Sequence, residues 1–165
     1  MTVIAFDGAR LCADSLTVDN WGSKSLYKEK IKEGKNFVWA GAGDISSLLA
    51  WEKTIRDKTW QEIVEEGYLP YEREHNDPSI LLIGFTGKVA TPHVIYTHEA
   101  GQFMPRIEPI AAIGSGSQYA IGVMSCGRCA DVAVRIASGH DVHCGGSIIC
   151  YDVREKAHQY ILGEK

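Results

Sequence analysis

The segment TVIAFDGARLCAD, residues 2–14, predicts a β-hairpin at the start of the chain. Apolar residues dominate 2–6 and recur through 9–14, and Asp7-Gly8 lies between the two runs. Asp-Gly in this setting is typical of a two-residue turn in which both residues adopt a positive φ. We therefore expect Thr2 at the start of the opening strand, at the end of an ordered sheet.

The rest of the chain alternates between blocks of strands and blocks of helices. Short apolar runs bounded by turn residues favour strands, and they lie at residues 36–40, 79–85, 94–96, 147–153 and 158–162. The meander that includes 94–96 is expected to reach Ile113, and 15–35 has room for a short strand pair. Antiparallel hairpins without βαβ alternation predict an α+β fold rather than a doubly wound one.

Two regions of the chain carry helix signals. Asp44 is a typical N-cap for a helix that contains Trp51, which is expected in the core. Thr59-Trp60-Gln61-Glu62 has the capping-box form before a further helix. Residues 117–138 predict a helix interrupted around Cys126-Gly127. Its second half has apolar residues at i, i+3, i+4 and i+7, namely Ala130, Ala133, Val134 and Ala137.

Length and composition place the chain among globular proteins. It has 165 residues, of which 45% are hydrophobic and 23% are charged, and its formal net charge is −4. These values exclude wholesale disorder, and the interspersed charges lack the basic surface of a nucleic-acid-binding protein. The sequence has no apolar run of membrane-spanning length, and its first residues are not a basic stretch followed by an apolar one. From these features and the charge pattern we expect no membrane partner and no nucleic-acid partner. We expect one domain over residues 1–165, located in the cytoplasm.

Five cysteines raise the question of disulfides and metal sites. Because their number is odd and the chain is long enough to form a core, we expect reduced, mostly buried thiols. Cys126 and Cys129 form a C-x-x-C pair, which could form a zinc site with His140 and His143. A helix over 130–138 would hold the two pairs roughly 13 Å apart, so we expect no metal and no cofactor.

Thr2 has the chemistry of a nucleophile once Met1 is removed, and removal is expected because threonine is small. The exposed residue carries a hydroxyl and a free α-amine on adjacent carbons, an arrangement that activates a hydroxyl without a separate histidine. The α-amine has an ordinary pKa of about 7.7–8.0, so it accepts a proton near neutral pH. This chemistry therefore depends on the removal of Met1.

Several motifs occur in order along the chain: Thr2-Val3-Ile4-Ala5, Asp7-Gly8, Ala13-Asp14-Ser15, Lys30-Ile31, Ala40-Gly41-Ala42-Gly43, Ile113-Gly114-Ser115-Gly116-Ser117 and Asp141-x-x-Cys144-Gly145-Gly146. From Thr2 to about Val153 this set resembles a proteasome β-type subunit, of the small bacterial or phage kind related to the protease HslV. These proteins are N-terminal-nucleophile hydrolases. The resemblance implies a four-layer αββα sandwich, with two antiparallel sheets between helix layers.

The resemblance also implies a role for each matching residue. Thr2 would be the nucleophile, with its Oγ attacking the scissile carbonyl. Lys30 would lie beside that Oγ and stabilise the alkoxide by its positive charge. Asp14 would pair with Lys30 and hold it in place.

Three further positions complete the implied site. Ser115 and Asp141 would form a hydrogen-bonded cluster around the Thr2 amine, and the backbone N–H of Gly43 would be the oxyanion donor. The chain departs from the family pattern at Leu16, where Arg is usual, and at Cys144, where Ser is common. A thiol is a weaker hydrogen-bond partner than a hydroxyl, so the supporting network is expected to be looser.

The function that the resemblance implies is that of a threonine-type peptidase subunit acting on peptides or unfolded proteins. Such subunits assemble into homo-oligomeric rings that enclose the active sites, and a separate ATPase unfolds their substrates. Two alternatives remain open from the sequence. One is a catalytically silent proteasome-like structural protein, which Leu16 and Cys144 favour modestly. The other is an N-terminal-nucleophile amidase that acts on a small molecule.

Overall fold

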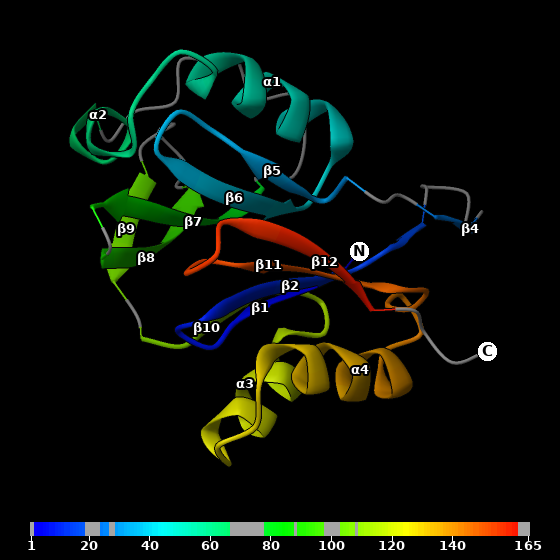
Figure 1. Cartoon of the computed structure of the whole chain (residues 1–165). Helices are drawn as coiled ribbons and strands as arrows, with labels where there is room; N and C mark the ends of the chain where they lie inside the picture. Colours follow the sequence, from blue (N-terminus) through cyan, green and yellow to red (C-terminus); the bar gives the residue numbers. More distant parts are fainter. Residues whose placement is uncertain are drawn as a thin grey trace.

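The fold consists of two antiparallel sheets that pack face to face, with a pair of helices outside each sheet (Figure 1). The computed structural model describes residues 2–18, 24–26, 29–66, 78–87, 89–97, 103–107 and 109–161. Each of the two sheets has five strands, and a separate two-stranded ladder lies beside them. This architecture confirms the predicted α+β class.

The first sheet carries the opening hairpin in its middle. Its strands, in spatial order, are β10 (Ala111–Gly114), β1 (Val3–Phe6), β2 (Arg10–Asp14), β11 (Ile148–Asp152) and β12 (Ala157–Ile161). The second sheet has the order β5 (Ile31–Glu33), β6 (Phe37–Ala42), β7 (Ser79–Thr86), β8 (Val89–Thr97) and β9 (Phe103–Ile107). The small ladder pairs β3 (Leu16–Val18) with β4 (Lys24–Leu26).

Two helices cover each sheet on its outer face. These are α1 (Ile45–Ile55) and α2 (Trp60–Glu66) on the second sheet, and α3 (Ser117–Ser125) and α4 (Ala130–His140) on the first. The predicted interruption around Cys126-Gly127 is confirmed, because the chain breaks between α3 and α4 at this point. No helix among the described residues is long and apolar enough to cross a membrane.

Three apolar layers hold the elements together. The central layer lies between the two sheets and includes Ile4 and Leu11 from one sheet and Leu81 from the other. A second layer packs the first sheet against α3 and α4, and a third packs the second sheet against α1 and α2. Strands β1 and β7 are therefore buried on both faces, which explains their nearly continuous apolar sequence.

The helix predictions are confirmed in their caps and in their buried faces. The Asp44 side chain accepts a hydrogen bond from the Ser47 N–H at 3.1 Å. The capping box is formed, since the Thr59 N–H donates to Glu62 Oε2 at 2.7 Å. Trp51 is fully buried. The four predicted core residues of α4 are also fully buried, namely Ala130, Ala133, Val134 and Ala137.

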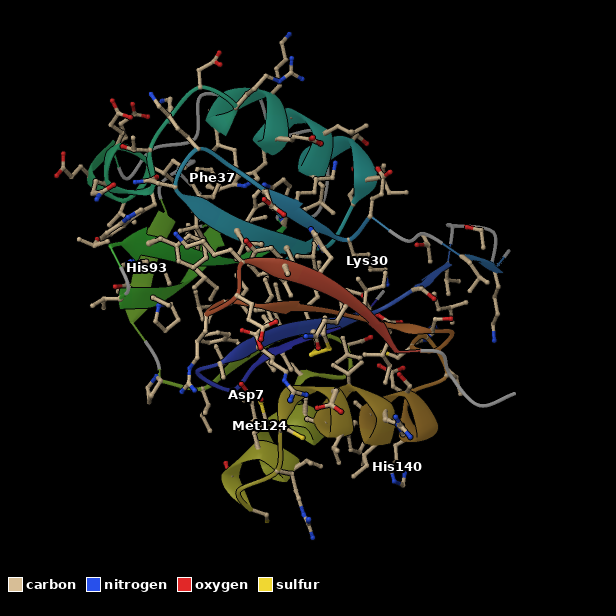
Figure 2. The ribbon with its side chains drawn as sticks, in the orientation of Figure 1. Asp7, Lys30, Phe37, His93, Met124 and His140 are labelled. Carbon is tan, nitrogen blue, oxygen red and sulfur yellow. A yellow bond between two sulfur atoms is a disulfide. The ribbon has the colours of Figure 1, made fainter. Side chains whose placement is uncertain are left out.

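The opening turn differs from the prediction in its centre. Gly8 has a φ of +94°, but Asp7 does not adopt a positive φ. Instead, Asp7 Oδ1 accepts hydrogen bonds from the N–H groups of Ala9 and Arg10, both at 2.8 Å. Its other oxygen accepts from the Ala130 N–H at 2.8 Å, at the first residue of α4. Asp7 thus lies beside the helix layer (Figure 2), where it joins the turn to a helix N-terminus.

The prediction of reduced cysteines is wrong for one pair. Cys12 on β2 and Cys150 on β11 are direct cross-strand partners with a Cα–Cα distance of 4.1 Å, and they form a disulfide. Spacing in the sequence could not reveal the pair, because the two cysteines are 138 residues apart and meet only because β2 lies beside β11. Cys126, Cys129 and Cys144 remain free thiols.

The disulfide predicts the outcome of a thiol titration. Denatured but unreduced protein should release three reactive thiols, and all five cysteines should react only after reduction. Because Cys126 is free and exposed, Cys126→Ser should lower the number of reactive thiols in denatured, unreduced protein by one. This variant serves as the control. Five reactive thiols in unreduced protein, prepared without a reductant, would contradict the pairing.

His93 is a buried ring on β8 without a hydrogen-bond partner among the described residues. It is 3% exposed, and its ring centroid lies 5.2 Å from that of Trp60. Figure 2 places it on the second sheet, far from Lys30. Burial lowers the pKa of His93 from its ordinary value of 6.5, because the charged ring loses its hydration.

We expect the free energy of unfolding to fall as the pH drops below about 6.5, because the unfolded chain then binds a proton that the folded chain binds less readily. His93→Phe should lose this part of the dependence, which amounts to at most about 1.4 kcal/mol per pH unit. Urea unfolding at about pH 7.5 and about pH 5.5 measures it. An equal loss of stability in both proteins would show that His93 is not responsible.

Candidate active site

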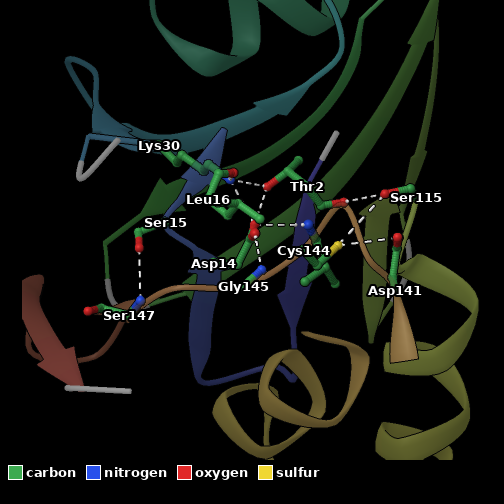
Figure 3. A network of polar contacts seen from close by, with 11 residues as sticks. Thr2, Asp14, Ser15, Leu16, Lys30, Ser115, Asp141, Cys144, Gly145 and Ser147 are labelled. Carbon is green, nitrogen blue, oxygen red and sulfur yellow. Dashed lines mark hydrogen bonds and ion pairs between the residues drawn. The ribbon is translucent and has the colours of Figure 1, made fainter. Parts of the chain in front are cut away.

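The site is built around Thr2, which directly precedes β1 and is 5% exposed. Lys30 lies just before β5 of the other sheet, 28 residues along the chain. Its Nζ donates to Thr2 Oγ1 at 2.5 Å and to Asp14 Oδ1 at 2.8 Å (Figure 3). The structure therefore brings together Thr2, Asp14 and Lys30.

Asp14 is a fully buried carboxylate at the end of β2. Its Oδ1 accepts hydrogen bonds from the Thr2 hydroxyl and, at 3.1 Å, from the Val3 N–H. Its Oδ2 accepts from the Gly145 N–H at 2.9 Å. With the Lys30 ammonium as a further partner, both oxygens are satisfied, which a buried charge requires.

Lys30 is held by three acceptors and is nearly buried, with a side chain 7% exposed. Besides Thr2 and Asp14 it donates to the backbone carbonyl of Leu16. Burial lowers the pKa of Lys30, while the Asp14 carboxylate opposes that shift. Since residue 16 contacts Lys30 through its carbonyl, this contact does not depend on whether Leu or Arg stands there.

Ser115, Cys144 and Asp141 form a second cluster next to Thr2 (Figure 3). Ser115 Oγ donates to the Thr2 carbonyl at 3.5 Å and lies 3.7 Å from Cys144 Sγ. The Cys144 thiol donates to Asp141 Oδ2 at 3.3 Å. The described contact with Thr2 is to its carbonyl oxygen, so the predicted role at the Thr2 nitrogen stays a prediction.

The ionisable groups of this second cluster have shifted pKa values. Burial raises the pKa of the Cys144 thiol to about 12, so Cys144 is a neutral hydrogen-bond donor near neutral pH. Burial alone would also raise the pKa of Asp141, but the neighbouring Ser115 hydroxyl and the hydrogen bonds from the His143 N–H and Cys144 outweigh it and lower that pKa. Asp141 is therefore a carboxylate to which the cluster donates.

Gly43 follows β6 and lines the same cavity as Thr2 and Lys30. Its φ is +137°, and a Cβ added there would lie 3.0 Å from the Cα of Pro78. Both observations favour glycine, because other residues are strained at this φ. The proposed donation of its N–H to an oxyanion stays a prediction.

The cavity beside Thr2 has a volume of about 400 Å³. Its floor includes Trp39 and Gly41 of β6, and apolar side chains of α1 and β4 form its walls. Three of these are large and exposed: Leu26, Ile45 and Leu49 are 62%, 57% and 56% exposed. A mostly apolar cavity with a few polar groups is typical of a substrate site.

Sequence reasoning missed how the loop after α4 supports Asp14. The Gly145 N–H reaches Asp14, and the Gly145 carbonyl accepts from the Leu16 N–H at 3.0 Å. Ser15 Oγ accepts from the Ser147 N–H at 2.8 Å. The Gly145-Gly146 pair was the available signal, since both residues adopt a positive φ. The loop after α4 thereby holds Asp14 and the two residues that follow it in place.

The C-x-x-C pair lies away from this site, in the turn between α3 and α4. Cys126 is exposed and Cys129 is half-buried. Among the residues that the structure describes, no group of three or more His, Cys, Asp or Glu side chains is placed to hold a metal ion.

Comparisons with known proteins give no family for this chain. No protein-family model matches it, and the comparison with curated proteins finds no match. The function is therefore argued from the geometry around Thr2 and from the motif resemblance.

Proposed function

We propose that the chain is a threonine-type endopeptidase subunit in which Thr2, exposed by removal of Met1, is the nucleophile. The observation that carries the proposal is the position of Lys30 Nζ, 2.5 Å from Thr2 Oγ1 and 2.8 Å from Asp14 Oδ1. A buried ammonium beside a hydroxyl is the arrangement needed to stabilise an alkoxide. Met1 lies outside the described residues, and its removal is part of the proposal.

The first half of the reaction forms an ester on Thr2. The α-amine takes the hydroxyl proton, and Oγ bonds to the carbonyl carbon of the scissile peptide. The resulting oxyanion is stabilised by the N–H of Gly43. The intermediate collapses, the C–N bond breaks, and the leaving amine departs with the proton held by the α-amine.

The second half of the reaction regenerates the enzyme. Water gives one proton to the α-amine and attacks the ester carbonyl, and the same N–H group stabilises the second oxyanion. When the C–O bond to Thr2 breaks, Oγ regains a proton and the acid product leaves. No other co-reactant is consumed, because the reaction is a net hydrolysis.

Lys30 and Asp14 have different electrostatic roles in this proposal. The Lys30 charge favours the Thr2 alkoxide, and burial strengthens the effect because little water screens it. Asp14 keeps the ammonium in position. Because burial lowers the pKa of Lys30, the ammonium shares its proton with Oγ more readily than an exposed lysine would.

The wider assignment is also proposed. The order helices, sheet, sheet, helices supports the four-layer sandwich of N-terminal-nucleophile hydrolases (Figure 1). On the family pattern, the subunit assembles into a homo-oligomeric ring in the cytoplasm and receives unfolded protein from a separate ATPase. The mostly apolar cavity beside Thr2 supports a peptide substrate.

Hydrolysis of a fluorogenic peptide, combined with size-exclusion chromatography, tests this function. We expect turnover by protein whose mass lacks Met1, in fractions of ring size. Processed protein with no turnover on a broad peptide panel would instead indicate the silent structural protein. Turnover of small amides alone by a monomer or dimer would indicate the amidase.

A further inference from the structure

The cavity runs from the reacting groups to a charged pair along one face of two strands. Ile31 is buried between the sheets, so Lys32 lies on the opposite face, toward α1. Lys30 precedes the strand, and its Nζ contacts Thr2 and Asp14 of the first sheet. Lys32 pairs in register with Trp39, and Gly41 follows Trp39 on the same face. Lys32 follows Lys30 by two residues, which in an extended chain span about 7 Å. This distance is about the length of one long side chain.

Helix α1 forms the opposite wall in the same direction. Ile45, Leu48 and Glu52 follow one another at i, i+3 and i+7 and all line the cavity, so they share one face of the helix. A Cβ added to Gly41 would lie 2.2 Å from Leu48 Cδ2, which shows that Leu48 packs directly on the floor. The wall is therefore apolar until it reaches Glu52.

Lys32 and Glu52 meet as an ion pair at the end of the cavity away from Thr2. Their side chains are 23% and 33% exposed, and Lys32 Nζ lies 5.9 Å from the centre of the Trp39 ring. The remaining charged residues that line the described cavity are Glu29 and Lys30. The four charges cancel, and Lys30 is already paired with Asp14.

We propose that Lys32 and Glu52 determine which substrate side chain the cavity accepts. Paired with each other, they leave the far end neutral, so the cavity takes an apolar side chain on the acyl side of the scissile bond. Either residue alone would leave one charge facing that side chain and favour the opposite charge on the substrate. This inference rests on the proposed peptidase function and assigns the substrate class of the same site.

The test uses the full chain and three tripeptide aminomethylcoumarins that end in Leu, Glu or Arg. Wild-type protein should prefer the Leu substrate in kcat/KM. Glu52→Gln should raise the Glu-to-Leu ratio of kcat/KM, and Lys32→Met should raise the Arg-to-Leu ratio, each about fivefold, the scale of a partly exposed charge pair. The double variant should return to the wild-type preference.

Lys58 and Glu66 provide a matched control, because they form a Lys–Glu ion pair at the α1–α2 end outside the cavity. Lys58→Met and Glu66→Gln should leave all three ratios unchanged. If the Lys32 and Glu52 variants change all rates by the same factor, or if the double variant keeps a shifted ratio, the pair has a structural role and the inference is wrong.

A binding experiment separates this inference from the peptidase proposal. If processed wild-type protein hydrolyses none of the three substrates, the peptidase proposal fails. Calorimetric titration of the corresponding peptide amides into the same proteins then decides the inference. A Leu preference that shifts with the single variants supports it, and equal or undetectable binding of the three peptides overturns it.

Discussion

Thr2→Ala is expected to abolish peptide hydrolysis, with a loss in kcat of about 10⁴-fold or more, because no other group replaces the nucleophilic oxygen. Alanine is small, so Met1 removal should proceed as before. Asp14 keeps its partners Lys30 and Gly145, so the fold should survive. Single-turnover and steady-state assays measure the loss, and thermal unfolding checks the fold.

Thr2→Ser is the matched control for this substitution, since it keeps the hydroxyl and loses only a methyl group. It should retain measurable hydrolysis, whereas Thr2→Ala should not. Activity in Thr2→Ala above a hundredth of the wild-type rate would contradict the assignment, provided that intact mass shows the substitution and the loss of Met1.

Lys30→Ala has the second largest expected effect. Removing the ammonium should lower kcat by about 10²–10³-fold, the cost of losing one electrostatic stabiliser of an oxyanion. It should also lower the free energy of unfolding by about 3–5 kcal/mol, because Asp14 is then a buried carboxylate without its cation. Activity assays and urea unfolding measure the two effects separately.

Lys30→Arg distinguishes the catalytic effect of residue 30 from its effect on stability. Arginine keeps the positive charge beside Asp14 and should recover most of the stability, but its planar group does not place a nitrogen at the same point beside Thr2 Oγ1. We therefore expect a folded protein with low kcat. Near-full activity in a folded Lys30→Ala protein would remove Lys30 from the mechanism.

The sequence predicts the elements of this fold better than their pairing. The buried face of α4 and the caps at Asp44 and Thr59 follow from local periodicity and capping chemistry, and the structure confirms them. The Cys12–Cys150 disulfide depends on β2 lying beside β11. No local pattern carries that information, because strand order is set by the packing of the whole chain.

In the candidate site, too, the sequence predicts local features better than the contacts between distant residues. The hydroxyl and amine of Thr2 suggest a nucleophile on local chemistry alone, but Lys30 and Asp14 are ordinary charged residues in the sequence. Only the motif resemblance selected them, and the structure brings them within hydrogen-bond distance of Thr2. The support from the Gly145 N–H and the Leu16 carbonyl was not predicted. The Gly145-Gly146 pair indicates a turn, but no side-chain pattern shows which groups the backbone of that turn contacts.

The most direct test of the central claim is to map where a peptide epoxyketone bonds to the purified protein. After proteolytic digestion, mass spectrometry should find one inhibitor mass on the N-terminal fragment, which begins at Thr2 and lacks Met1. Thr2→Ala should remain unlabelled. A fragment that retains Met1 and carries no inhibitor, or a label on Cys126 or Cys144 instead, would contradict the account.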